Sequence, residues 1–282
     1  MNARTIRKTL TYIFLTAVLA VTIFPIIYTL LASLKDNLEI LTEPGRLIPR
    51  NPTFDNYITA WDSDDFQVKT QFFNSLLYTG VMLTCNLFVS SLAGFSFAKL
   101  KFPFKWVIFA CFNFLLFVKL GGISVYATFD VLNLFHLPRN LYTLMLVNLF
   151  GVPVANIYLV KSFVEGLPDS VVEAAKIDGC SLWGIFFKII FPLITPVIAT
   201  IAVLSFKGSW NDYIMPTIFT LTKPDQRTLM VGLMALKSTG GAATNWAVML
   251  AGTTISMIPV LVAYTVCNKY FVKGITVGAE KG

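Results

Sequence analysis

The amino-acid sequence predicts an all-α integral membrane protein, and three observations lead to that fold class. Hydrophobic residues make up 56% of the 282 residues and charged residues only 13%, and the mean hydropathy is +0.71, far from the profile of a soluble domain. Five long intervals contain no Asp, Glu, Lys or Arg, and a helix needs roughly 20 apolar residues to cross the hydrocarbon core. Basic residues gather in alternate connecting segments, as expected for a multi-pass protein. Lipid is therefore the expected solvent.

We expect six transmembrane helices in one membrane domain that covers residues 1–282. The first, about residues 10–34, is longer than the apolar part of a signal peptide and lacks a small-x-small cleavage site, so we interpret it as a retained helix. The second, about 74–98, carries small residues that let helices pack closely in lipid. The third, about 106–128, requires Lys119 to lie near its outer end. The last three cover about residues 140–162, 192–216 and 245–268.

The distribution of Lys and Arg predicts that both termini lie in the cytoplasm. With the N-terminus inside, the inner segments carry twelve of the 22 basic residues, whereas the first outer loop, residues 35–71, has more acidic than basic residues. Proline and glycine in this loop predict an exposed cap without a core of its own. The net charge of +7 is thus explained by topology, and because the basic residues form no single stripe we expect no nucleic-acid binding.

The sequence contains no pattern typical of a catalytic or metal centre. A GxxxxGK[ST] phosphate loop, a metal-ligand cluster and a nucleophile–base pairing are all missing. The four cysteines lie in three spans and one inner loop without paired spacing, which is typical of small core residues. We therefore expect no catalytic residue and no metal, and the chain alone should not hydrolyse ATP.

The inner loop between the fourth and fifth spans, residues 163–191, is the most informative segment. Pro168 and Asp169 predict the start of a helix, with the carboxylate satisfying free backbone N–H groups. Gly179 suits a left-handed stop about three turns later, and Ser181 can cap a second, mostly apolar helix. These residues alone are equally compatible with an interfacial amphipathic helix whose lysines lie at lipid headgroups.

The spacing of residues in this loop resembles the EAA signature of the permease subunits of ATP-binding-cassette (ABC) importers. The pattern is Glu173-Ala174-Ala175, three residues, Gly179, nine residues, Ile189, one residue and Phe191-Pro192, with Phe191 standing where leucine is usual. Further matches resemble the six-span subunit of the maltose-type carbohydrate importers; they are Phe95 to Lys99, Ile177 to Gly179, Trp210 to Tyr213, and the tail from Phe271 to Gly282. The resemblance extends from about Asn74 to the C-terminus, with departures between Lys119 and Asn140.

This resemblance implies a permease that translocates a sugar or oligosaccharide by alternating access in the cytoplasmic (inner) membrane of a bacterium or archaeon. The implied partners are a second homologous permease subunit in a heterodimer, two ATPase subunits that bind ATP and Mg, and an extracytoplasmic substrate-binding protein. The chain itself would bind no cofactor. The EAA loop would be the coupling helix, docking on an ATPase subunit through Glu173, Ala174, Ala175, Asp178 and Gly179.

The C-terminal tail is similar to that of the same subunit, which implies contact with the ATPase interface. Its residues are Gly278, Ala279, Glu280, Lys281 and Gly282. The alternative is a frayed end without contacts.

Ionisable residues inside the spans are unusual, and Lys207 in the fifth span is the most unusual of them. One interpretation pairs Lys207 with Asp212 or a backbone carbonyl; the other makes it, together with Lys119, part of an electropositive path suited to an acidic saccharide. A helix break at Trp210-Asn211 would expose polar groups to a cavity. Three neighbours could contact sugar or anchor the membrane interface; they are Trp210, Asn211 and Tyr213. Together with Lys207, Lys119 and Asp212 they are the candidate residues of the substrate path.

Two other functions stay open. The EAA loop is shared with ABC permeases for amino acids, peptides and phosphate, although the Trp-Asn-Asp element and the tail favour sugar. A stand-alone secondary transporter would need an internal proton or ion relay, and the spans offer only Lys207, Lys119 and Asp212 as ionisable candidates.

Overall fold

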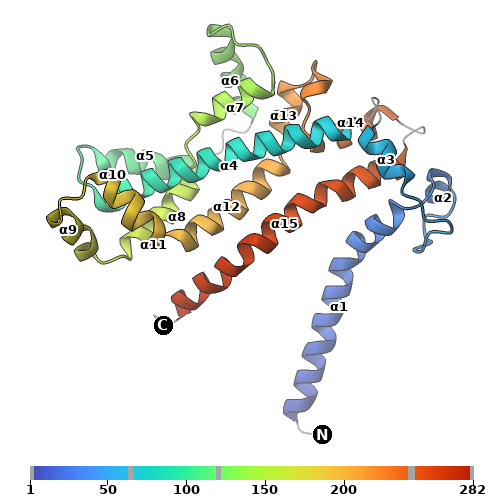
Figure 1. Cartoon of the computed structure of the whole chain (residues 1–282), viewed down its shortest axis with the longest axis horizontal. Helices are drawn as coiled ribbons and strands as arrows, with labels where there is room; N and C mark the ends of the chain where they lie inside the picture. Colours follow the sequence, from blue (N-terminus) through green and yellow to red (C-terminus); the bar gives the residue numbers. More distant parts are fainter. Residues whose placement is uncertain (1–2, 63–66, 119–121, 241–244, 280–282) are drawn as a thin grey trace. The chain divides into compact units, whose positions relative to one another are not determined.

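The computed structural model describes residues 3–62, 67–118, 122–240 and 245–279, and within these ranges the regular structure is helical (Figure 1). The chain forms two compact units, Met1–Phe72 with Leu229–Ile258, and Phe73–Thr228 with Pro259–Gly282. Two long helices have residues in both units; they are α4 (Val68–Lys99) and α15 (Trp246–Ala279).

The first unit is tied together by polar contacts around its connecting loop. The side chain of Lys35 is 1% exposed and donates to the carbonyl of Arg46, while the Asn56 amide donates to the carbonyls of Ser33 and Lys35, both at 2.8 Å. These bonds satisfy backbone carbonyls that have no helical partner. The other helices of this unit are α1 (Ala3–Ala32), α2 (Asn37–Thr42), α3 (Asp55–Asp62) and α14 (Leu229–Gly240).

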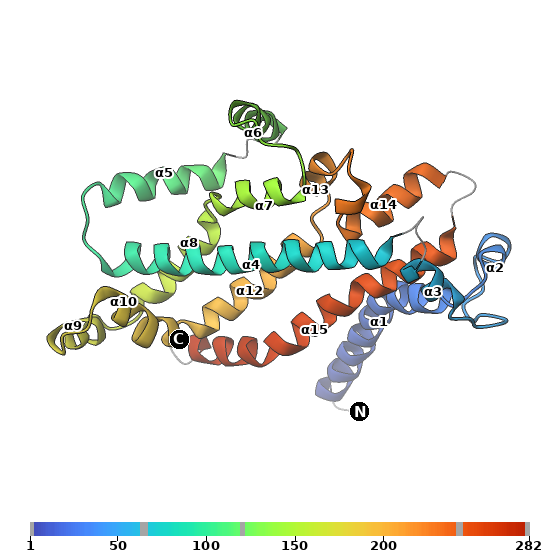
Figure 2. The ribbon, with the colours of Figure 1, turned by 45° about the horizontal axis from the view of Figure 1, so that its top comes forward.

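The second unit holds the elements that carry the candidate site (Figure 2). In chain order after α4 they are α5 (Lys105–Phe117), α6 (Gly122–Leu134), α7 (Leu141–Leu149), α8 (Val154–Glu165), α9 (Asp169–Ile177), α10 (Leu182–Gly184), the π-helix η1 (Ile185–Ile190), α11 (Phe191–Leu193), α12 (Thr195–Trp210), α13 (Ile214–Phe219) and the 3₁₀ turn η2 (Pro224–Gln226). One buried cluster joins α4, α8, α9, η1 and α12. The inner loop therefore shares its core with three spans.

The second span packs closely where its small residues predict it. A Cβ built on Gly94 of α4 would lie 2.6 Å from the Val160 side chain and 3.0 Å from the Lys161 amide nitrogen, both on α8. Only a residue without a side chain permits this approach, which is the usual way that small residues bring membrane helices together. The sequence prediction of a packing face is confirmed at this position.

Four helical stretches among the described residues are long and apolar enough to cross a membrane. They are Arg7–Ala32, Val68–Lys99, Leu141–Glu165 and Trp246–Cys267. A fifth results if Leu182–Leu193 and Thr195–Trp210, which meet at a bend of 78°, form one span. These stretches overlap the expected first, second, fourth, sixth and fifth spans, and α12 ends at Trp210 with Asn211 as its C-cap, as the expected helix break predicts.

The third expected span differs from the prediction of one helix over residues 106–128. The helix α5 ends at Phe117, Val118 has extended backbone angles, and α6 begins at Gly122. A glycine pair in the sequence, Gly121-Gly122, disfavours a continuous helix, because glycine loses more backbone entropy than other residues. Lys119 lies outside the described residues.

Candidate coupling site and translocation path

The helix α9 ends in the way its sequence predicts. Gly179 has a φ of +75°, and the Cys180 and Gly179 amides donate to the carbonyls of Ala175 and Lys176 at 3.0 and 3.1 Å. This pair of bonds is the Schellman motif, which satisfies the last carbonyls of a helix and reverses the chain. The first arm of the predicted helix–glycine–helix element is confirmed.

The second arm also begins where expected. The Ser181 hydroxyl accepts a hydrogen bond from the Gly184 amide at 3.2 Å, which is an N-cap. The helix then widens into the π-helix η1 before α11, a feature that the sequence pattern did not indicate and that often occurs at functional sites. Phe186 of η1 is 1% exposed and packs against Phe95 of α4, with ring centroids 5.6 Å apart.

Asp169 does not cap α9, so that expectation was wrong. Its carboxylate lies 2.5 Å from the ammonium group of Lys99, at the end of α4, and Lys99 also donates to the Leu167 carbonyl at 2.7 Å. The hydrogen bond from Lys99, and then its positive charge, lower the pKa of Asp169. The carboxylate is drawn to a nearby cation, and Pro168 takes the N-cap position without a side-chain bond. Lys99 thus joins α4 to the start of α9.

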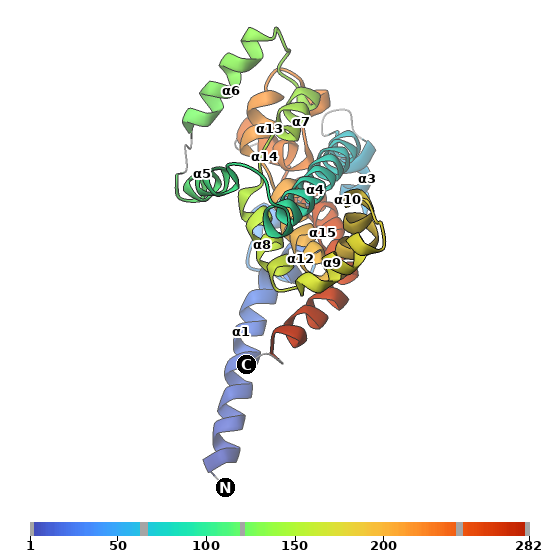
Figure 3. The same ribbon diagram turned by 90° about the vertical axis from the view of Figure 1, so that its left-hand side faces the viewer.

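The five expected docking residues do not share one surface. Glu173, Ala174, Asp178 and Gly179 are exposed, whereas Ala175 is 4% exposed and belongs to the buried cluster with Val172. Ala175 therefore attaches α9 to the rest of its own unit. Figure 3 views this end of the unit, with α9 and α10 toward the viewer. Of the tail residues, Gly278 and Ala279 are at the end of α15, and Glu280, Lys281 and Gly282 lie outside the described residues.

Lys207 does not pair with Asp212, which corrects the pairing interpretation. Asp212 accepts a hydrogen bond from the hydroxyl of Tyr78 on α4, at 2.8 Å. Among the described residues Lys207 has no ion pair, and its side chain is exposed. Asp212 lies five residues further on and past the end of α12, so the two side chains are not neighbours on one helix face.

The neighbours of Lys207 have different environments. Trp210 is 4% exposed and stacks on Phe206, with ring centroids 5.7 Å apart, so it is a packing residue in this unit. The Asn211 amide donates to the Lys207 carbonyl at 2.9 Å, and Tyr213 is 42% exposed. The exposed candidates along this segment are therefore Lys207, Asn211 and Tyr213.

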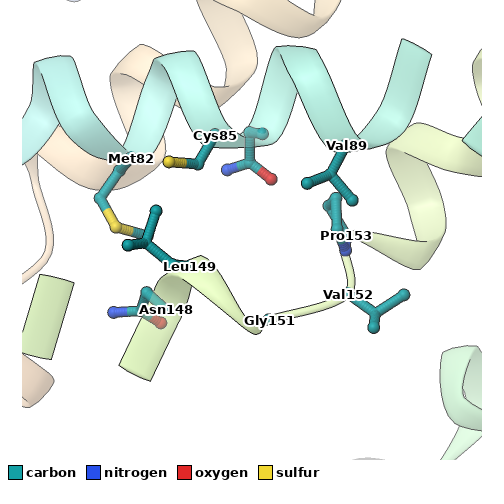
Figure 4. Close-up of a pocket in the computed structure, with 9 residues that line it drawn as sticks. Met82, Cys85, Val89, Asn148, Leu149, Gly151, Val152 and Pro153 are labelled. Carbon is teal, nitrogen blue, oxygen red and sulfur yellow. The ribbon is translucent and has the colours of Figure 1, made fainter. Parts of the chain in front are cut away.

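A cavity that the sequence patterns did not single out lies between α4 and the connection from α7 to α8 (Figure 4). Its volume is about 180 Å³, and the side chains of Asn86 and Asn148 line it together with mostly apolar neighbours. The sequence does contain a signal for the interruption between α7 and α8, because Gly151 and Pro153 are residues that interrupt helices. Nothing in the local pattern indicated that α4 would lie opposite this interruption.

Residues 72–277 match the family described as the binding-protein-dependent transport system inner membrane component. The chain belongs to this family. It is 32% identical over 262 residues to the arabinooligosaccharides transport system permease protein AraQ of Bacillus subtilis, covering 92% of this chain and 91% of that protein. It is 30% identical over 283 residues to the galactooligosaccharides transport system permease protein GanQ of the same species, covering 99% of this chain and 97% of that protein.

One solved structure has the same fold over nearly the whole chain. It is the crystal structure of a bacterial ABC transporter involved in the import of the acidic polysaccharide alginate, with a TM-score of 0.82, 24% sequence identity, and coverage of 96% of this chain and 98% of that one. Family membership confirms the resemblance derived from the sequence. The chain is a multi-pass permease subunit of an ABC importer in the inner membrane, a transport component and not an enzyme, and it works with an ATPase and a substrate-binding protein.

Proposed function

We propose that this permease imports an oligosaccharide by alternating access, in a heterodimer with a second permease subunit and driven by two ATPase subunits that hold ATP and Mg. The observation that supports this mechanism is the hairpin formed by α9 and by α10 with η1, because α9 and η1 share one buried core with α4, α8 and α12. A stiff element packed on three spans can turn closure of a docked ATPase pair into rigid-body movement of those spans. The relatives named for arabino- and galactooligosaccharides support the substrate class.

We propose that four exposed residues of the hairpin, Glu173, Ala174, Asp178 and Gly179, make the docking face. Small residues permit close approach, and Glu173 offers a carboxylate to a basic partner. Ala175 is buried and packs α9 against the rest of the cluster. The tail from Gly278 to Gly282 is proposed as a second contact with the ATPase subunits.

For the topology we propose six spans with both termini in the cytoplasm, in one membrane domain over residues 1–282. This arrangement puts α9 on the cytoplasmic side, where the ATPase subunits lie. The first outer loop, residues 35–71, is then extracytoplasmic, and α5 with the residues after it supplies the third crossing.

An acidic saccharide is the second candidate substrate class. Lys207 is exposed and has no ion pair among the described residues, so its charge is free for an anionic group on the path, and Lys119 is proposed to add to it. The solved transporter with the same fold is involved in the import of an acidic polysaccharide. Lys207→Met should then reduce uptake of an acidic oligosaccharide while leaving that of a neutral one unchanged; equal rates for both substrates in the variant and the wild type would exclude this role.

Reconstitution in proteoliposomes tests the proposed function. With its second permease, ATPase subunits and binding protein, the chain should accumulate an oligosaccharide from a panel of arabinotriose, galactotriose and an oligomannuronate trimer, only when ATP is inside. Uptake of amino acids, peptides or phosphate in place of all three sugars would favour the non-sugar alternative. Uptake by this chain alone, driven by a proton or sodium gradient, would favour a secondary transporter.

A further inference from the structure

The connection between α7 and α8 exposes non-helical backbone in the middle of a membrane span. Helix α7 ends at Leu149 and α8 begins at Val154, roughly midway along the apolar stretch Leu141–Glu165. Gly151 is exposed, and Phe150 is 82% exposed. Irregular backbone at membrane depth is tolerated only where protein buries it or where it lines a water-filled cavity. This segment therefore faces a partner subunit or an aqueous path, and not lipid.

The cavity beside this connection carries polar groups that need a partner. Asn148 uses one amide hydrogen to bond the Leu144 carbonyl, at 3.0 Å. Asn86, from the middle of α4, makes no side-chain hydrogen bond within the part of the chain that the structure describes, although it is half-buried. An amide left without a partner in an apolar medium costs about 2–7 kcal/mol. Water or a solute must therefore complete the hydrogen bonding at this point.

The composition of the cavity indicates which solute fits. Figure 4 shows Met82, Cys85 and Val89 from α4 opposite Asn148 and Pro153, with no charged side chain among the residues that line the space. Amides both donate and accept hydrogen bonds, as sugar hydroxyls do. Apolar side chains suit the C–H faces of a sugar ring. The volume of about 180 Å³ is below the roughly 300–1,000 Å³ of complete ligand pockets, which fits one sugar unit and a site shared with another subunit.

We infer that Asn86, Asn148 and the exposed backbone at Gly151 form this subunit's half of a sugar-binding site on the translocation path. The inference rests on the proposed import of an oligosaccharide and adds the place where this chain contacts the sugar. The broken helix supplies the site in the way that discontinuous helices do near the midplane of other transporters. Neutral hydroxyl groups are the recognised feature, because the cavity holds no charge.

The native Cys85 in the cavity wall provides the test. A variant that keeps Cys85 and has Cys111, Cys180 and Cys267 changed to serine is reconstituted with its partner subunits and treated with 2-aminoethyl methanethiosulfonate. We expect labelling of Cys85 and at least fivefold slower labelling when the oligosaccharide that the complex imports is present. A matched variant that keeps only Cys111, exposed on the apolar helix α5, should show no protection by sugar.

A second measurement addresses binding by the amides. Asn86→Ala should lower the rate of oligosaccharide uptake about threefold to tenfold, the worth of one hydrogen bond, while ATP hydrolysis stays at its original rate. Thr84→Ala, on an exposed face of the same helix, should change neither rate. A complex that imports oligosaccharide but leaves Cys85 unlabelled, or labelled without protection by sugar, would overturn the inference alone. A complex that imports none of the three sugars would overturn the proposed function and the inference together.

Discussion

Gly179 has a φ of +75° and no neighbouring atom within 4 Å of where a Cβ would be placed. A side chain at this position would therefore have enough space, and it is the backbone conformation that favours glycine. Residues with a Cβ lose about 1–2 kcal/mol in the left-handed region, and here that strain would act on the turn that sets the angle between α9 and α10. The only glycine with positive φ among the described residues thus lies at the proposed point of force transmission.

Gly179→Ala should lower oligosaccharide uptake more than ATP hydrolysis, because a strained turn makes the hairpin a poorer rigid link between the ATPase subunits and the spans. Gly184→Ala is the matched control, since Gly184 has helical backbone angles and its Cβ would meet only the Ser181 hydroxyl, at an ordinary 3.4 Å, and the Cys180 side chain at 3.9 Å. Both rates are measured on the same proteoliposomes. Equal behaviour of the two variants would argue against a conformational role for Gly179.

Lys99 and Asp169 form an ion pair whose two side chains differ in exposure. The Lys99 side chain is 6% exposed and also bonds the Leu167 carbonyl, whereas the Asp169 side chain is 78% exposed. Exposed ion pairs contribute little to stability because water screens them. The bond to the carbonyl, which has no helical partner, is the part that holds the start of α9 against α4.

Lys99→Met should therefore lower the thermal unfolding midpoint of the reconstituted subunit more than Asp169→Asn does. The pKa of Asp169 is lowered in the folded chain, so its stabilising effect is present above the ordinary Asp pKa of about 3.9 and is lost as the pH falls through the folded value. The difference in Tm between wild type and Asp169→Asn should be constant from pH 8 to about pH 5 and shrink only in stronger acid. A difference that grows in acid would contradict the ion pair.

At the level of helices, the contact between α4 and α8 depends on Gly94. The Val160 side chain occupies the space where a Cβ at Gly94 would go, and Val160 itself is fully buried. A methyl group here must push the two helices apart, and such overpacking costs about 1–3 kcal/mol. The same helix offers a contrasting site, because a Cβ at Gly80 would meet no neighbouring atom within 4 Å.

We expect Gly94→Ala to lower the Tm and the yield of assembled complex, whereas Gly80→Ala should leave both unchanged. Thermal unfolding followed by size-exclusion chromatography compares the two variants directly. The close approach of α4 to α8 would be disproved if Gly94→Ala were as stable as Gly80→Ala.

Most helix limits were accessible from the sequence, including the end of α12 at Trp210, but the interruptions inside the third and fourth expected spans were not. Capping residues and glycine act on the next few backbone groups, so Ser181 and Gly179 predicted the hairpin correctly. The ends of α5 and α7 lie inside apolar runs, where hydropathy stays high through a break. Gly121-Gly122 and Gly151 were visible but, without knowledge of the surrounding helices, single glycines do not distinguish a bend from an end.

For the whole molecule, topology is the main prediction. Reporter domains that are active only in the cytoplasm should work at the C-terminus and after inner segments, and fail after outer ones. Inner positions are Phe102 and Asp178; outer positions are Arg50, His136 and Asp225. Activity at His136 would mean that residues 105–135 do not cross the membrane, which leaves five spans and moves every later segment to the opposite side.

By itself the sequence determined the membrane class, the turn and cap of the α9–α10 hairpin, and the family, because hydropathy, capping and the spacing from Glu173 to Pro192 are properties of neighbouring residues. Only the tertiary structure decided which face of α9 is outward, with Ala174 exposed and Ala175 buried. It also decided that Asp212 bonds Tyr78, 134 positions away, and that Asn86 faces the break between α7 and α8. These are contacts between distant segments, and they depend on how the helices pack against one another, which no local pattern encodes.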